Sequence, residues 1–100
     1  MEVVSSLLHF RKAPMIKKFI LNKYGETTVE TTPFHILSVQ MQGDNLVVWI
    51  NTGSVELRQY VPKSKVVFTI VYTGDNAPVS TSVYISTVQH GDLVYHVYAH

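Results

Sequence analysis

The chain has 100 residues, no cysteine and a formal net charge of +1 at pH 7. This length suits one domain with a single core, and the lack of cysteine excludes disulfides, thiolate metal ligands and cysteine nucleophiles. Duplex nucleic acid is not an expected partner, because Lys17-Lys18 and the pair Lys63/Lys65 are too small as cationic clusters to neutralise several phosphates.

Residues 1–14, MEVVSSLLHFRKAP, form a leader that differs from the rest of the chain. Its apolar run from Val3 to Leu8 lacks a basic start and is too short to span a bilayer, so we expect neither an export signal nor a membrane partner. Pro14 separates the leader from Met15, which suits a second start of translation. The expectation is a short helix or a disordered arm, followed by a single β domain over residues 15–100.

From residue 16 onward the pattern is typical of strands. Residues 16–22 form an apolar run, and the β-branched stretch 27–32 suits an edge strand. After Pro33, residues 34–42 and 46–52 are predicted to pair as a hairpin. The turn between them is Gly43-Asp44, with glycine first, as a two-residue type II′ turn requires.

This turn fixes the register of the first hairpin, with Gln42 opposite Asn45. One face is then apolar, and its predicted pairs are Met41 with Leu46, Val39 with Val48 and Leu37 with Ile50. The other face is mixed and leaves the Trp49 ring half covered.

Three further segments precede the last hairpin. Residues 55–61 are predicted to form a strand that Pro62 ends. Residues 66–72 are a nearly continuous apolar run, typical of a central strand covered on both faces. Residues 73–82 contain the Gly, Asp, Asn, Pro and Ser content of a loop.

The last hairpin turns at Gly91-Asp92. One predicted face carries Tyr84, Ser86, Val88, Leu93, Tyr95, Val97 and Ala99. The other carries Val83, Ile85, Thr87, Gln89, Val94, His96, Tyr98 and His100. The two hairpins share Val-Gln, Gly-Asp and Leu-Val elements. Either one hairpin is a duplicate of the other, or the likeness reflects the small number of residue types that suit tight turns. The expected fold is all-β, a small antiparallel sandwich or partly open barrel built from hairpins.

No catalytic or metal-binding motif stands out. His96 and His100 would share a strand face about 13 Å apart and His90 would project from the opposite face, so no metal site and no cofactor are expected. The sequence has neither a serine between glycines at a strand-to-helix turn nor a glycine-rich phosphate loop. We therefore predict a protein that is not an enzyme.

The remaining function class is binding of a partner through aromatic and polar side chains. Charged residues are sparse at 15% while tyrosine is plentiful, which favours a surface partly covered by a partner, including a homo-oligomer. Tryptophan, tyrosine and arginine dominate binding hot spots. The candidate binding residues are Trp49, Arg58, Tyr60, Thr87, Gln89, His96 and Tyr98.

The segments ILSVQMQGDNLVVWI, YTG at residues 72–74 and YISTVQHGDLVYHVY together resemble a family of short proteins of tailed bacteriophages. The likeness covers residues 15–99 and includes the Lys-rich start MIKKF. The family usually has glycine where this chain has Ser86 and tryptophan where it has Tyr95, and Tyr72 before the Thr-Gly pair is a further departure.

The resemblance implies a phage origin and a life in the cytoplasm of the infected bacterium, but no activity. It is consistent with an accessory host-takeover or anti-defence factor that binds a host protein or sequesters a small nucleotide-type ligand. The alternatives are a structural or assembly protein of the phage particle and, third, an enzyme.

Overall fold

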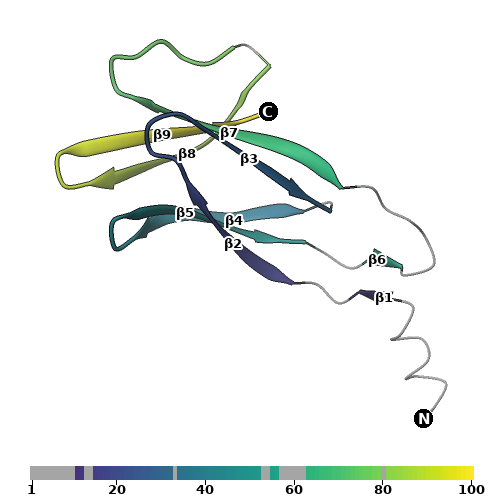
Figure 1. Ribbon diagram of the computed structural model, residues 1–100. Coiled ribbons are helices and arrows are strands. Elements are labelled where there is room, and N and C mark those ends of the chain that lie inside the picture. Colours follow the sequence, from purple (N-terminus) through teal and green to yellow (C-terminus); the bar gives the residue numbers. More distant parts are fainter. Residues whose placement is uncertain (1–10, 13–14, 33, 53–54, 57–62, 80) are drawn as a thin grey trace.

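The computed structural model describes residues 11–12, 15–32, 34–52, 55–56, 63–79 and 81–100 (Figure 1). These ranges contain strands and no helix. The strands are β1 (Arg11–Lys12), β2 (Ile16–Leu21), β3 (Glu26–Thr31), β4 (His35–Gln42), β5 (Asn45–Asn51), β6 (Val55–Glu56), β7 (Ser64–Tyr72), β8 (Val83–His90) and β9 (Leu93–Ala99). The leader 1–10 and most of the strand predicted at 55–61 lie outside the described residues.

Seven of these strands form two antiparallel sheets that face each other in a sandwich-like fold (Figure 1). The three-stranded sheet has the order β2-β5-β4, and the four-stranded sheet has the order β3-β7-β9-β8. The short strands β1 and β6 pair separately. The all-β prediction is confirmed, and of its two architectures the sandwich is the one that forms, since the sheets do not close into a barrel.

The core lies between the two sheets and follows from alternation along the strands. Leu46, Val48 and Ile50 point inward from β5, while Phe68 points inward from β7 and Val97 from β9, and all five side chains are buried. Burial of one such side chain is worth about 1.5–3 kcal/mol. The core is thus supplied mainly by the middle strands of both sheets.

Both predicted two-residue turns are present. Gln42 pairs with Asn45 and His90 with Leu93. The φ angles of Gly43 and Gly91 are 62° and 60°, and no described residue other than glycine has a positive φ. A positive φ at the first turn residue alone is the type II′ conformation, so the turn prediction is confirmed.

The predicted registers are correct near the turns and wrong beyond them, because each hairpin contains a β-bulge. In the first hairpin the register shifts between Ile36 and Ser38, so Ile36 and not Leu37 lies opposite Ile50. Leu37 is 50% exposed instead of lying in the core. An extra residue on one strand reverses the faces of all residues beyond it.

The same shift occurs in the last hairpin between Tyr84 and Ser86, which moves Tyr84 opposite Tyr98. The bulged residues Leu37 and Ile85 each stand six positions before the glycine of their turn. The two hairpins therefore share turn type and bulge position as well as sequence elements.

Strand β7 is central in its sheet, as predicted, between β3 and β9, and β3 is an edge strand. The prediction that β7 is covered on both faces is wrong. Phe68 and Ile70 on its inner face are buried, whereas Val67 and Val71 on its outer face are only half-buried. No further strand or helix covers this face among the described residues, and its side chains range from half-buried to exposed.

Tyr72 closes one end of the core. Its ring lies 5.5 Å from the Tyr95 ring and 6.5 Å from the Tyr24 ring, measured between centroids. Its hydroxyl donates a hydrogen bond to the Lys23 carbonyl at 3.0 Å. Desolvation raises the pKa of Tyr72 above its ordinary value, with smaller contributions from Tyr95, Tyr24 and Asp75.

This pKa shift predicts a loss of stability in alkali. The unfolded chain releases the Tyr72 proton near pH 10.0, while the folded chain retains it to higher pH. The contribution is therefore fully present below pH 10.0 and decreases as pH rises through the folded pKa. In denaturant titrations the Tyr72→Phe protein should lose less free energy of unfolding above pH 10.0 than the wild type. Equal pH dependence in the two proteins would contradict this assignment.

Candidate functional site

A group of polar and aromatic side chains occupies the outer face of the four-stranded sheet. We call it the His96 cluster, and it consists of Thr73, Tyr84, Thr87, His96 and Tyr98. Three of its members, Thr87, His96 and Tyr98, were predicted from the sequence as candidate binding residues. Alternation along β8 and β9 places these three on one face, as the sequence indicated.

Cross-strand pairing aligns these side chains in rows. Thr69 of β7, Tyr98 of β9 and Tyr84 of β8 form one row, because the residue pairs are Thr69–Tyr98 and Tyr84–Tyr98. His96 and Thr87 belong to the next row, where His96 pairs with Thr87 on one side and with Val71 on the other. Neighbouring rows on one face are within reach of long side chains.

Hydrogen bonds connect four members of the cluster in a chain. The Tyr84 hydroxyl lies 2.8 Å from Thr87 Oγ1, which lies 3.0 Å from His96 Nδ1. His96 Nε2 lies 2.8 Å from Thr73 Oγ1. Both ring nitrogens of His96 therefore have a hydroxyl partner, and each hydroxyl can donate or accept. The ring is held in place in either tautomer.

Tyr84 and Tyr98 form an aromatic pair beside this chain. Their ring centroids are 5.8 Å apart and their planes meet at 74°, an edge-to-face arrangement. Tyr84 is 54% exposed. Alternation along the strand predicts Tyr84 on the opposite face, and this prediction is wrong because of the bulge at Ile85. No alternation rule would have placed Tyr84 beside Thr87, because residues three apart share a face only across a bulge.

The other predicted binding residues do not join the cluster. Gln89 lies on the same face of β8, nearer the turn, where its side-chain amide lies 3.5 Å from the Gly91 carbonyl. Trp49 is half-buried on the outer face of the other sheet, as predicted for its ring. Arg58 and Tyr60 lie outside the described residues. The candidate residues therefore do not form one site.

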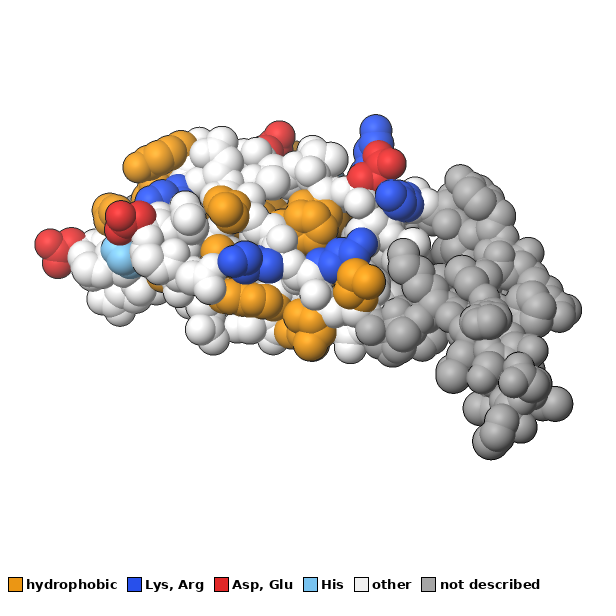
Figure 2. Space-filling view, turned by 60° about the horizontal axis from the view of Figure 1, so that its bottom comes forward, with side chains coloured by type: hydrophobic (Ala, Val, Ile, Leu, Met, Phe, Trp, Pro, Cys, Tyr) orange, Lys and Arg blue, Asp and Glu red, His pale blue; other side chains and the backbone are white. Residues whose placement is uncertain are grey.

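Around Trp49 the outer face of the three-stranded sheet is mixed in character. Figure 2, viewed from the side of β2, shows hydrophobic side chains around lysines. Ile16 and Ile20 of β2 are 65% and 57% exposed. Lys18, between them, donates a hydrogen bond from Nζ to Gln42 Oε1 at 2.8 Å and so reaches from β2 to β4 across β5.

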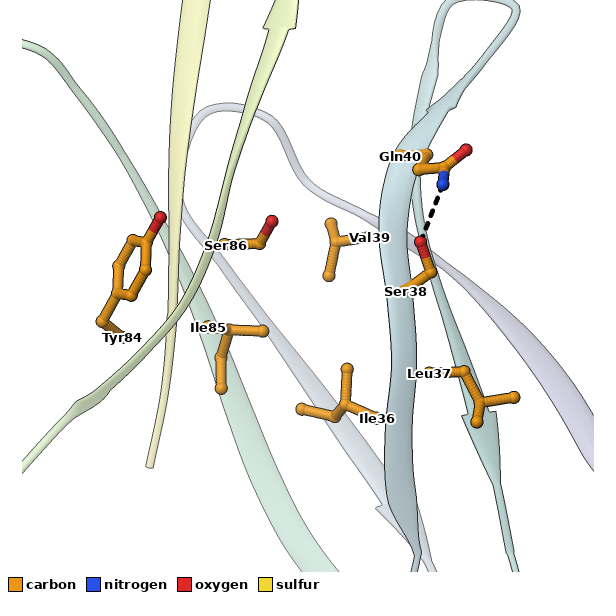
Figure 3. A pocket seen from close by; sticks show the side chains of 8 residues that line it. All are labelled: Ile36, Leu37, Ser38, Val39, Gln40, Tyr84, Ile85 and Ser86. Carbon is orange, nitrogen blue, oxygen red and sulfur yellow. Dashed lines mark hydrogen bonds between the residues drawn. The ribbon is translucent and has the colours of Figure 1, made fainter.

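An opening lies between β4 and β8, the adjacent edge strands of the two sheets (Figure 3). Its volume is about 520 Å³, and Ile36 and Val39 face Ile85 and Ser86 across it. The remaining lining residues are Leu37, Ser38, Gln40 and Tyr84. None of the lining residues is charged, so the opening offers no cation to a phosphate group.

Within the part of the chain that the structure describes, no three histidine, aspartate or glutamate side chains gather closely enough to hold a metal ion. His100 Nδ1 is instead 3.5 Å from Ser82 Oγ. The same residues include no helix with the length and apolar character needed to cross a membrane.

Comparison with curated proteins and with solved structures gave no match. One family model matches residues 14–100, which is most of the chain and includes both sheets and the His96 cluster. Its description is a domain of unknown function, so the match assigns no activity. The chain is a member of the family described as domain of unknown function DUF7352.

Proposed function

We propose that this protein is a non-enzymatic binding module and that the His96 cluster contacts a partner protein. The main support for this proposal is that four side chains of the His96 cluster are already held in place by hydrogen bonds. Tyr84, Thr87, His96 and Thr73 are hydrogen-bonded to one another before any partner arrives. Side chains that are already ordered lose less conformational entropy on binding, which raises affinity.

The shape and charge of the cluster favour a protein over a nucleotide. Thr87, His96 and Tyr98 lie on the outer face of the sheet and line no pocket that the described residues form, whereas small ligands bind in concave pockets that bury most of their surface. The cluster contains no lysine or arginine to pair with a phosphate. An outer sheet face that carries tyrosine side chains is typical of protein interfaces.

The arrangement also supports a binding role over catalysis. An activated hydroxyl nucleophile needs a base that a third group orients, as in serine hydrolases. The hydrogen-bond partners of the His96 ring are two threonine hydroxyls, with no carboxylate among them. Within the proposal, the phage resemblance suggests a host protein as the partner and host takeover or anti-defence as the role.

Native mass spectrometry of the protein expressed in a bacterial host tests the proposal. The wild type should carry a host protein, and Tyr98→Ala should lose it. Truncation of a hot-spot aromatic costs at least about 2 kcal/mol, which is roughly a 30-fold loss of affinity. The matched control is Thr28→Ala, an exposed side chain on the outer face of the same sheet, in β3. It should retain the partner.

Three outcomes would count against the proposal. A small-molecule adduct in place of a protein would favour sequestration of a nucleotide-type ligand. Loss of the partner in both variants, or in neither, would place the interface elsewhere on the molecule. Copurification with phage particles, with no host protein bound, would favour the alternative role in the structure or assembly of the particle.

A further inference from the structure

The edge strands of the two sheets differ in charge. At one side of the sandwich β2 carries Lys17 and Lys18, and β3 carries Glu26 and Glu30. At the other side, the eight residues of β4 and the eight of β8 include no lysine, arginine, aspartate or glutamate. Charged side chains on an edge strand discourage pairing with another strand. Only the edges at the opening lack this protection among the sheet edges that the structure describes.

The turn determines which backbone groups of β8 point away from β9. Residues that flank a two-residue turn form a hydrogen-bonded pair, and bonded and non-bonded pairs alternate from there. His90 and Leu93 flank the turn and form such a bonded pair, and two residues further along β8 the backbone of Val88 is again hydrogen-bonded to β9. The N–H and C=O groups of Thr87 and Gln89 therefore point outward, and β8 has no other described strand beside it in its sheet.

The bulge leaves enough regular strand for pairing. Bulges protect an edge by twisting it away from a partner. In β8 the irregularity ends at Ser86, and residues 86–90 then pair with β9 in continuous register. Five regular residues therefore remain between the bulge and the turn, and they contain both outward-pointing amides.

We propose that β8 pairs antiparallel with β8 of a second copy of this chain, across a two-fold axis at Val88, the middle residue of the regular segment. The uncharged strand is suited to be its own partner. Thr87 would then face Gln89 of the other copy, so that the outward N–H and C=O groups of these two residues form the new hydrogen bonds. Self-pairing of β2 would instead bring the lysines of the two copies close together, which is unfavourable. A two-fold contact is closed, so it ends at a dimer and does not extend into a fibre.

Sedimentation and amide exchange on the full chain test this pairing. Sedimentation should show a dimer that dissociates on dilution. The amide protons of Thr87 and Gln89 should exchange slowly in the dimer and quickly in the monomer. The amide of Thr28, which points outward from the charged edge strand β3, should exchange quickly in both states.

A matched pair of proline variants gives the second measurement. Thr87→Pro removes an outward N–H that β9 does not use, and should weaken dimerisation at least about tenfold. Thr28→Pro makes the same change on β3 and should leave dimerisation unaltered. A monomer at every concentration would overturn the proposal. A dimer in which both variants behave alike, or in which the β8 amides stay unprotected, would also overturn it.

Discussion

Replacement of Phe68 by alanine is expected to lower the free energy of unfolding by about 3–5 kcal/mol. Phe68 lies in the central strand β7, is 1% exposed and belongs to the one core between the sheets. Single domains are stable by only about 5–15 kcal/mol, so this loss would leave the variant close to unfolding at room temperature. Urea denaturation followed by circular dichroism measures the change.

Leu37→Ala is the informative comparison, because the sequence pattern assigned Leu37 to the same core. In the structure the bulge leaves this side chain 50% exposed, and we expect its removal to cost less than about 1 kcal/mol. A cost at Leu37 as large as that at Phe68 would show that Leu37 packs against Ile50 and that the first hairpin has no bulge.

The two bulges mark the limit of what the sequence could predict about the fold. Near the glycine turns the predictions are correct: Val39 pairs with Val48, and Thr87 and His96 share a face, on which they are also paired. Beyond Leu37 alternation no longer identifies the face, because an extra residue in one strand reverses it. The neighbouring residues Ile36 and Leu37 are both apolar, so hydrophobicity gave no sign of where the extra residue lies.

The candidate site was predicted in part for a related reason. Thr87, His96 and Tyr98 share a hairpin face that does not cross the bulge, so alternation sufficed to group them. Thr73 joins them only through the pairing of β7 with β9, a contact distant in sequence that periodicity does not reveal. Trp49 lies apart from them because its strand, β5, belongs to the other sheet. Which strands share a sheet depends on the strand order, and periodicity does not reveal that order.

Gly91→Ala is expected to destabilise the protein by about 1–3 kcal/mol, the cost to an L-residue of the positive-φ conformation that a type II′ turn requires at its first position. Gly91 has a φ of 60°, and a Cβ atom built there meets no atom within 4 Å. Crowding by atoms beyond the two neighbouring residues therefore contributes nothing, and the effect comes from the local backbone conformation of the turn. Thermal or urea unfolding of the variant measures it, and Gly43→Ala, at a φ of 62° in the equivalent turn, should behave alike.

Two comparisons distinguish the effect of the positive φ angle from the effect of replacing any glycine by alanine. Gly25 has no positive φ, and a Cβ there meets Asn22 Nδ2 at an ordinary 3.4 Å, so Gly25→Ala should cost less than Gly91→Ala. Chemical synthesis with D-alanine at position 91 should restore wild-type stability, because a D-residue adopts a positive φ without strain. If D-alanine and L-alanine at this position were equally destabilising, the turn would not be type II′. The register that places His96 beside Thr87 would then lose its basis, because it is counted from that turn.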